Sequence, residues 1–210
     1  MRLALAYKGA PCRQYALDYF DDETFFELGI ERKVPVLELD GALHTDSLTI
    51  LRHIDELFPA GAALVEGRID EPAWQALVEW RRAVDNILQR LYAPALPAYV
   101  DIGTNEAAVA SYKAAVQRRF GLSAEELAND RYAGYEQLER QTRLKALARH
   151  LAENSFYMGQ PSIADMVLTA DLYPLQLLDG VALPIDLLYY LGRVQETCGL
   201  RLDEGLLIDL

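Results

Sequence analysis

The chain has 210 residues, of which 51% are hydrophobic and 25% are charged, and this composition excludes disordered and collagen-like architectures. At about 150 residues per domain, the length allows one large domain or two small ones. The 20 Lys and Arg residues face 32 Asp and Glu residues, and the net charge of −12 disfavours nucleic-acid binding through a broad basic face.

The sequence contains neither a long apolar segment nor a leader pattern. No apolar run reaches about 18 residues, the length expected of a membrane-spanning helix. The first eight residues, from Met1 to Lys8, lack the length and the cleavage pattern of a signal peptide. We therefore expect a cytoplasmic protein with no membrane partner.

A strand and a tight hairpin are predicted in the first third of the chain. Val34–Leu39 reads as a strand, and Asp40-Gly41 directly after it is a strong short hairpin signal. Residues 42–44 are the expected return strand. Apolar residues then recur at helical spacing from Ile50 to Phe58, and Ser47 is placed to cap the first turn of that helix.

The composition changes once, near Pro59, and this change suggests two domains. We expect an α/β domain over residues 1–59, an Ala- and Gly-rich linker over 60–69, and an all-helical domain over 70–210. The helical part contains several N-terminal signals, at Asp70-Glu71-Pro72, at the capping box Ser123–Glu126 and at Ser162–Asp165. The helix after Ser162 is unusually apolar, so we expect it to form the core of this part and assign Ser162 and Asp165 to folding.

The sequence contains few residues that could bind a metal or form disulfides. Cys12 and Cys198 are too few for a disulfide framework or a thiolate metal site. The three histidines have no Cys or carboxylate neighbours at metal-ligand spacing. We therefore expect no metal, and we expect Cys198, on a helical stripe, to be a core residue.

Three motifs, in this order and spacing, resemble the glutathione transferase family. They are Lys33-Val34-Pro35-Val36-Leu37, Thr45-Asp46-Ser47-Leu48-Thr49-Ile50 and Gly159-Gln160-Pro161-Ser162-Ile163-Ala164-Asp165. The resemblance covers nearly the whole chain. It implies a thioredoxin-like N-terminal domain, an all-α C-terminal domain, a homodimer, and glutathione as cosubstrate.

The resemblance implies a glutathione site at the first two motifs. A cis Val34–Pro35 bond would turn the Val34 backbone outward to pair with an extended peptide. Ser47 would offer its hydroxyl to a carboxylate, Asp46 would hold the ammonium, and Lys33 could reach the other carboxylate. Purely structural roles stand beside these, because Ser47 would cap its helix without any ligand and Asp46 would complement the helix dipole.

The N-terminal residues depart from the family pattern. Arg2–Gly9 resembles the end of the family's first helix, with Gly9 ending it, and Cys12–Tyr19 would then be the second strand. Asp22–Leu28 would be the second helix. On this interpretation the first strand and the thiol-activating loop lie upstream of Met1, so the thioredoxin-like domain is incomplete and no catalytic residue is assigned.

A second interpretation makes Arg2–Tyr7 the first strand and Gly9–Cys12 the catalytic loop. Cys12 would then precede a helix over Arg13–Phe20, and its thiolate could form a mixed disulfide with glutathione. Only 21 residues separate Cys12 from Val34 (34 − 12 − 1), too few for the elements the family places there, so we favour the first interpretation.

The expected activity is conjugation or thiol transfer of glutathione to a small electrophile. In the family the acceptor lies between the two domains, and the residues to examine for it are Trp80, Arg81, Arg82 and Tyr92; packing and ion pairing are the alternative roles for these side chains. The alternative function is a non-catalytic binding or regulatory module that has the same fold and acts through protein contacts.

Overall fold

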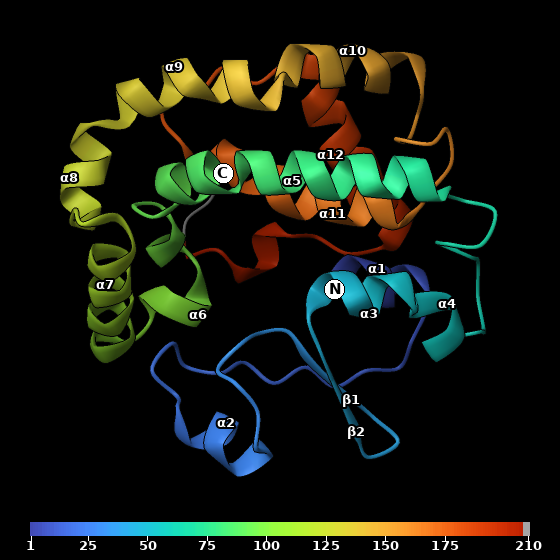
Figure 1. Cartoon of the computed structure of the whole chain (residues 1–210), viewed down its shortest axis with the longest axis horizontal. Coiled ribbons are helices and arrows are strands. Elements are labelled where there is room, and N and C mark those ends of the chain that lie inside the picture. The colour runs from blue at the N-terminus through green and yellow to red at the C-terminus, as the bar shows by residue number, and fades with distance from the viewer. Residues whose placement is uncertain (208–210) are drawn as a thin grey trace.

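The computed structural model describes residues 1–207, in which a small α/β unit precedes a larger set of helices (Figure 1). The first part consists of α1 (Arg2–Tyr7), α2 (Glu23–Leu28), β1 (Val36–Leu39), β2 (Ala42–Thr45), α3 (Ser47–Arg52) and α4 (Ile54–Leu57). The second part consists of α5 (Glu71–Tyr92), η1 (Leu96–Ala98), α6 (Val100–Gly103), α7 (Glu106–Phe120), α8 (Ala124–Asn129), α9 (Arg131–Thr142), α10 (Leu144–Glu153), α11 (Ile163–Leu172), η2 (Tyr173–Leu177), α12 (Ile185–Cys198) and η3 (Asp203–Gly205). None of the helices within residues 1–207 combines the length and the apolarity that a membrane span requires.

The predicted hairpin is confirmed. β1 and β2 pair antiparallel, with Leu39 opposite Ala42 at the turn. Asp40 and Gly41 have φ angles of 51° and 78°, and two positive φ values in a two-residue loop match the twist of the flanking strands. β1 begins at Val36, later than expected, because Pro35 has no N–H to donate to a strand ladder.

The N-terminal segment is a helix, so the interpretation of Arg2–Tyr7 as a strand is wrong. Its central residues, Leu3 to Leu5, are buried in the main core. Gly9, with a φ of 61°, ends α1, and the Ala10 N–H donates to the Leu5 carbonyl at 3.0 Å. This is the expected glycine termination of a helix.

The predicted strand over Cys12–Tyr19 is also wrong. Residues 11–18 carry no regular secondary structure, and the paired strands within residues 1–207 are β1 and β2 alone. An alternating pattern forms a strand only when a neighbouring strand accepts its backbone hydrogen bonds. Tyr19 instead meets Tyr112 of α7 edge to face, with ring centroids 5.2 Å apart.

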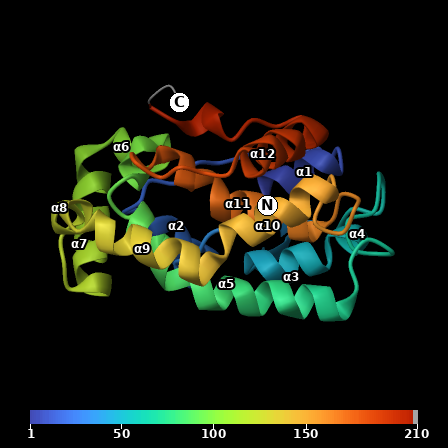
Figure 2. The same cartoon turned by 90° about the horizontal axis from the view of Figure 1, so that it is seen from above.

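The apolar helix predicted after Ser162 is the centre of the second part. Eight of the ten residues of α11 are buried, and in Figure 2 the helix lies between α5 and α12. The buried Asp165 carboxylate accepts the Ser162 N–H at 2.9 Å and the Tyr190 hydroxyl at 2.9 Å. This confirms the capping box, and the tyrosine bond connects the start of α11 to α12.

The segment 60–69 contains no helix or strand, but it is held firmly by Asp55 of α4. The Asp55 carboxylate accepts the backbone N–H groups of residues 64, 65 and 66 at 2.8 to 3.1 Å. It also accepts the Lys8 ammonium at 3.0 Å, and the Lys8 side chain is only 1% exposed. One carboxylate thus binds α1, α4 and the segment between the two parts.

We expect Asp55→Asn to lower the free energy of unfolding by about 3 kcal/mol, because it leaves a buried Lys8 charge without its counter-ion. Urea unfolding followed by circular dichroism measures the change. Asp18→Asn is the matched control, since Asp18 is exposed and its carboxylate makes no hydrogen bond within residues 1–207. Equal stability of the two variants would contradict the role assigned to Asp55.

The contribution of Asp55 should depend on pH. Burial alone would raise the pKa of Asp55, but the three backbone N–H donors and the Lys8 ammonium outweigh it and hold the pKa below its usual range. A lowered pKa in the folded state stabilises the protein above the unfolded value of about 4 and ceases to do so as the pH falls through the folded value. The stability difference between wild type and Asp55→Asn should therefore shrink below about pH 4.

Candidate functional site

The loop before β1 presents an exposed backbone. The Val34–Pro35 bond is cis, as expected, and Val34 is 69% exposed. No hydrogen bond within residues 1–207 occupies the Val34 N–H or C=O. A peptide laid along this loop would find both groups available.

The start of α3 differs from the prediction in one respect, because Asp46 and not Ser47 caps this helix. Asp46 has a φ of 71°, and its Oδ1 accepts the Thr49 N–H and the Thr49 hydroxyl, each at 2.9 Å. Ser47 is the first residue of the helix, and its hydroxyl has no hydrogen-bond partner within residues 1–207. The Ser47 hydroxyl is therefore free for a ligand.

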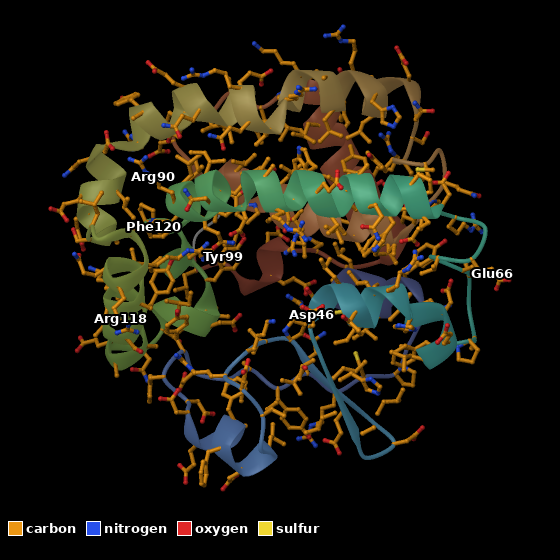
Figure 3. The ribbon with its side chains drawn as sticks, viewed as in Figure 1. Asp46, Glu66, Arg90, Tyr99, Arg118 and Phe120 are labelled. Carbon is orange, nitrogen blue, oxygen red and sulfur yellow. The ribbon has the colours of Figure 1, made fainter. Side chains whose placement is uncertain are left out.

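Lys33 and Asp46 lie close together across the two loops. The Lys33 Nζ is 3.7 Å from the Asp46 Oδ2, and both side chains are about half exposed. Bonds from the Thr49 N–H and hydroxyl, helped by Lys33, hold the pKa of Asp46 below its usual range, so the carboxylate is ionised at neutral pH. Figure 3 shows Asp46 at the start of α3, between the β-hairpin and α5.

The four predicted binding residues lie in two loops at one end of the β-hairpin, beside the start of α3, and we call this place the corner. They come from two loops that the β-hairpin joins, one before β1 and one after β2. The corner offers a cation (Lys33), an anion (Asp46), a hydroxyl (Ser47), and the backbone N–H and C=O of Val34, which have no hydrogen-bond partner within residues 1–207. This set of groups suits a zwitterionic peptide. Thr49 was not predicted, although its position three residues after Asp46 is the spacing of an N-terminal cap.

Cys12 lies in the irregular segment after α1. The residue is exposed, and the helix predicted to follow it over Arg13–Phe20 is absent from the structure. The helix terminus that was expected to activate this thiol is therefore missing. Cys198 is buried, with its Sγ 3.7 Å from the Met166 Sδ, as expected for a core residue.

Three of the four α5 residues singled out for an acceptor make contacts within the second part. The Trp80 indole N–H donates to the Thr142 carbonyl at 3.2 Å, and the Tyr92 hydroxyl donates to the Asp171 carbonyl at 2.6 Å. The Arg81 Nε donates to the Asp171 carboxylate at 2.7 Å. These bonds favour the packing and ion-pairing alternatives for these three side chains.

Two cavities of the described residues have linings that contain none of the four corner residues. One, of about 420 Å³, lies between α10 and α12, and the other, of about 190 Å³, is lined by residues of α5, α8 and α9 and by the end of η2.

The capping geometry separates the structural role of Asp46 from that of Ser47. Asp46→Ala should lower the free energy of unfolding by about 1 kcal/mol, because it removes the cap of α3. Ser47→Ala should change it by less than about 0.5 kcal/mol. Thermal unfolding of the two variants side by side checks this, and a larger loss for Ser47→Ala would contradict the assignment.

The sequence matches one family model over its N-terminal part. Residues 1–63 match the model of the glutathione S-transferase N-terminal domain. Among curated proteins, no sequence matches this chain.

Solved structures with the same fold cover nearly the whole chain. Glutaredoxin 2 from Salmonella typhimurium, solved in complex with glutathione, is 18% identical with a TM-score of 0.78, and the match covers 99% of this chain and 92% of that one. A glutathione S-transferase from Ceriporiopsis subvermispora, also in complex with glutathione, is 17% identical with a TM-score of 0.71 and coverages of 100% and 89%. A glutathione transferase from Phanerochaete chrysosporium is 16% identical with a TM-score of 0.66 and coverages of 93% and 88%.

The predicted fold class, a small thioredoxin-like unit followed by a helical region, is confirmed by these matches. Residues 1–63 are similar to the glutathione S-transferase N-terminal domain, and the chain as a whole has the fold of these solved structures.

Proposed function

We propose that this chain is a glutathione transferase-like protein that binds glutathione at the corner of Lys33, Val34, Asp46 and Ser47. The observation that carries the proposal is the convergence of these groups. An ionised Asp46 lies 3.7 Å from Lys33, beside a Ser47 hydroxyl and a Val34 backbone that have no partner within residues 1–207.

Each part of glutathione has a complementary group at this corner. The γ-glutamyl end of the peptide is a zwitterion, so its ammonium suits Asp46 and its carboxylate suits Ser47. The Val34 N–H and C=O suit the central peptide groups, as in the addition of a strand to an exposed backbone. Lys33 is the remaining cation, and it would neutralise the second carboxylate.

Two of the structures with the same fold were solved with glutathione bound, which supports glutathione as the ligand of this chain. The activity we propose is conjugation or thiol transfer to a small electrophile, in which the corner residues hold and orient the peptide. We also retain as proposals the division into residues 1–59 and 70–210 joined by 60–69, a homodimer, and a cytoplasmic location.

Calorimetry with glutathione on the full chain tests the proposal. We expect saturable binding that Ser47→Ala weakens about tenfold or more, because a hydrogen bond to a charged carboxylate is lost. The matched control is Ser111→Ala, which removes a hydroxyl from α7, on the opposite side of the molecule from α4 in Figure 1. Because Ser47 is not a cap, weaker binding cannot be attributed to an unfolded α3.

The outcomes separate the enzyme from a binding module. Binding together with turnover of a model electrophile supports the transferase. Binding that Ser47→Ala weakens, without turnover of any electrophile tested, supports the alternative of a non-catalytic module. Absence of glutathione binding to the folded chain would contradict the proposed site. An equal loss of glutathione affinity in Ser47→Ala and Ser111→Ala would contradict it as well.

A further inference from the structure

The smaller cavity forms where several helices end. α5 ends at Tyr92 with Ala93 as its C-cap, and Pro94 comes next, so the chain does not continue the helix. The opposite wall is the end of η2 at Leu177 and Leu178. The adjoining α5–α9 crossing is close, since a Cβ on Gly134 would lie 2.5 Å from a methyl of Leu91. The remaining space is about 190 Å³.

The size and the lining of this cavity indicate what kind of chemical group could fit inside it. Its walls are mostly aliphatic, and they include the buried side chains of Leu91 and Leu127. The volume is below the roughly 300 Å³ at which pockets for drug-sized ligands begin. It exceeds the roughly 150 Å³ of a dry apolar cavity that admits benzene. A single aromatic ring therefore fits in this space.

One cation lines this apolar space. Arg131, the first residue of α9, is half-buried, and it has no carboxylate partner within residues 1–207. The neighbouring Asp130 is already paired with Arg90, a residue labelled in Figure 3. The Arg131 guanidinium lies only over the Tyr132 ring, 5.6 Å from its centroid. A guanidinium beside an apolar cavity, with no carboxylate partner within residues 1–207, gains from an anionic partner.

The remaining wall is fixed in place. The Tyr135 hydroxyl donates to the Asp179 carbonyl at 2.7 Å, and the ring packs where a Cβ on Gly180 would lie 3.8 Å from it. This tyrosine therefore supplies a ring face and has its hydroxyl occupied. The Asp179 carboxylate also lines the cavity, but the residue is exposed, so water screens its repulsion of an anion.

We propose that this cavity is a binding site for a small aromatic monocarboxylate. The ring enters the aliphatic space between α5, α8 and η2, and the carboxylate pairs with Arg131 at the rim. The site is separate from the glutathione corner, because Asp46 and Arg90 lie in different parts of Figure 3. The proposal for this cavity can therefore be tested independently of the proposed transferase function.

Titration of the full chain with sodium phenylacetate, followed by ¹⁵N NMR and calorimetry, tests the proposal. We expect saturable binding with shifts of the backbone signals around Arg131 and Leu178. Arg131→Gln should weaken it about tenfold. Ala128→Leu, which extends an apolar side chain into the cavity, should abolish it. Asp179→Asn should strengthen it, because it removes the opposing charge.

The matched control is Arg118→Gln, which removes the same charge from an exposed position of α7 away from the cavity (Figure 3). It should leave phenylacetate binding unchanged, and glutathione should not displace phenylacetate. Absence of saturable binding would overturn the proposal. So would equal weakening by Arg118→Gln and Arg131→Gln, which would indicate long-range charge alone, or equal affinity for benzylamine, which would show that the carboxylate is not recognised.

Discussion

The Asp55 carboxylate is the interaction on which the arrangement of this molecule depends. It accepts hydrogen bonds from three backbone N–H groups of the segment between the two parts, and it neutralises the buried lysine that follows α1. The segment so held contains Leu64, which is fully buried and whose carbonyl accepts the Ile163 N–H at 3.0 Å. Asp55 thus fixes the segment that is bonded to the first residue of α11.

The corner proposed for glutathione depends on the same contact. α4, which carries Asp55, follows α3 with only His53 between them. Both helices bury apolar residues, including Ile50 and Ile54, so neither can rotate alone. Fixing Asp55 therefore fixes the axis of α3, and the axis of α3 sets where Asp46 and Ser47 lie. An exposed, polar corner can keep a defined geometry because its support is buried.

Local signals were sufficient to predict much of the fold. The Asp40-Gly41 hairpin, the Asp70 cap and the Ser123 and Ser162 capping boxes each depend on residues within four positions of one another. The four corner residues come from two loops next to a single hairpin, but their role in binding was expected from the family resemblance and stays a prediction. The hairpin and the helix caps follow from chemistry between neighbouring residues, and a single sequence contains that information.

Features that depend on distant partners were predicted wrongly or not at all. The pattern in residues 12–19 suits a strand, but a strand also needs a neighbour, which a local pattern cannot provide. Asp46 and Ser47 are both capping residue types, and the backbone geometry at Asp46 decided between them. The cavity beside Arg131 joins residues up to 88 positions apart in the sequence (Leu91 to Asp179), so no motif could reveal it.

The pairing of Lys33 with Asp46 bears on how the corner would bind a zwitterion. An exposed ion pair of this kind contributes only about 0–1 kcal/mol, so a ligand can separate it at little cost. The two bonds from Thr49 hold the Asp46 carboxylate in place whether or not Lys33 is near. A ligand ammonium can therefore replace Lys33 at the Asp46 Oδ2 while the released lysine meets a ligand carboxylate. A ligand that carries only one of these charges would separate the pair without supplying both replacements, so we expect the proposed corner to favour a zwitterion over a simple anion.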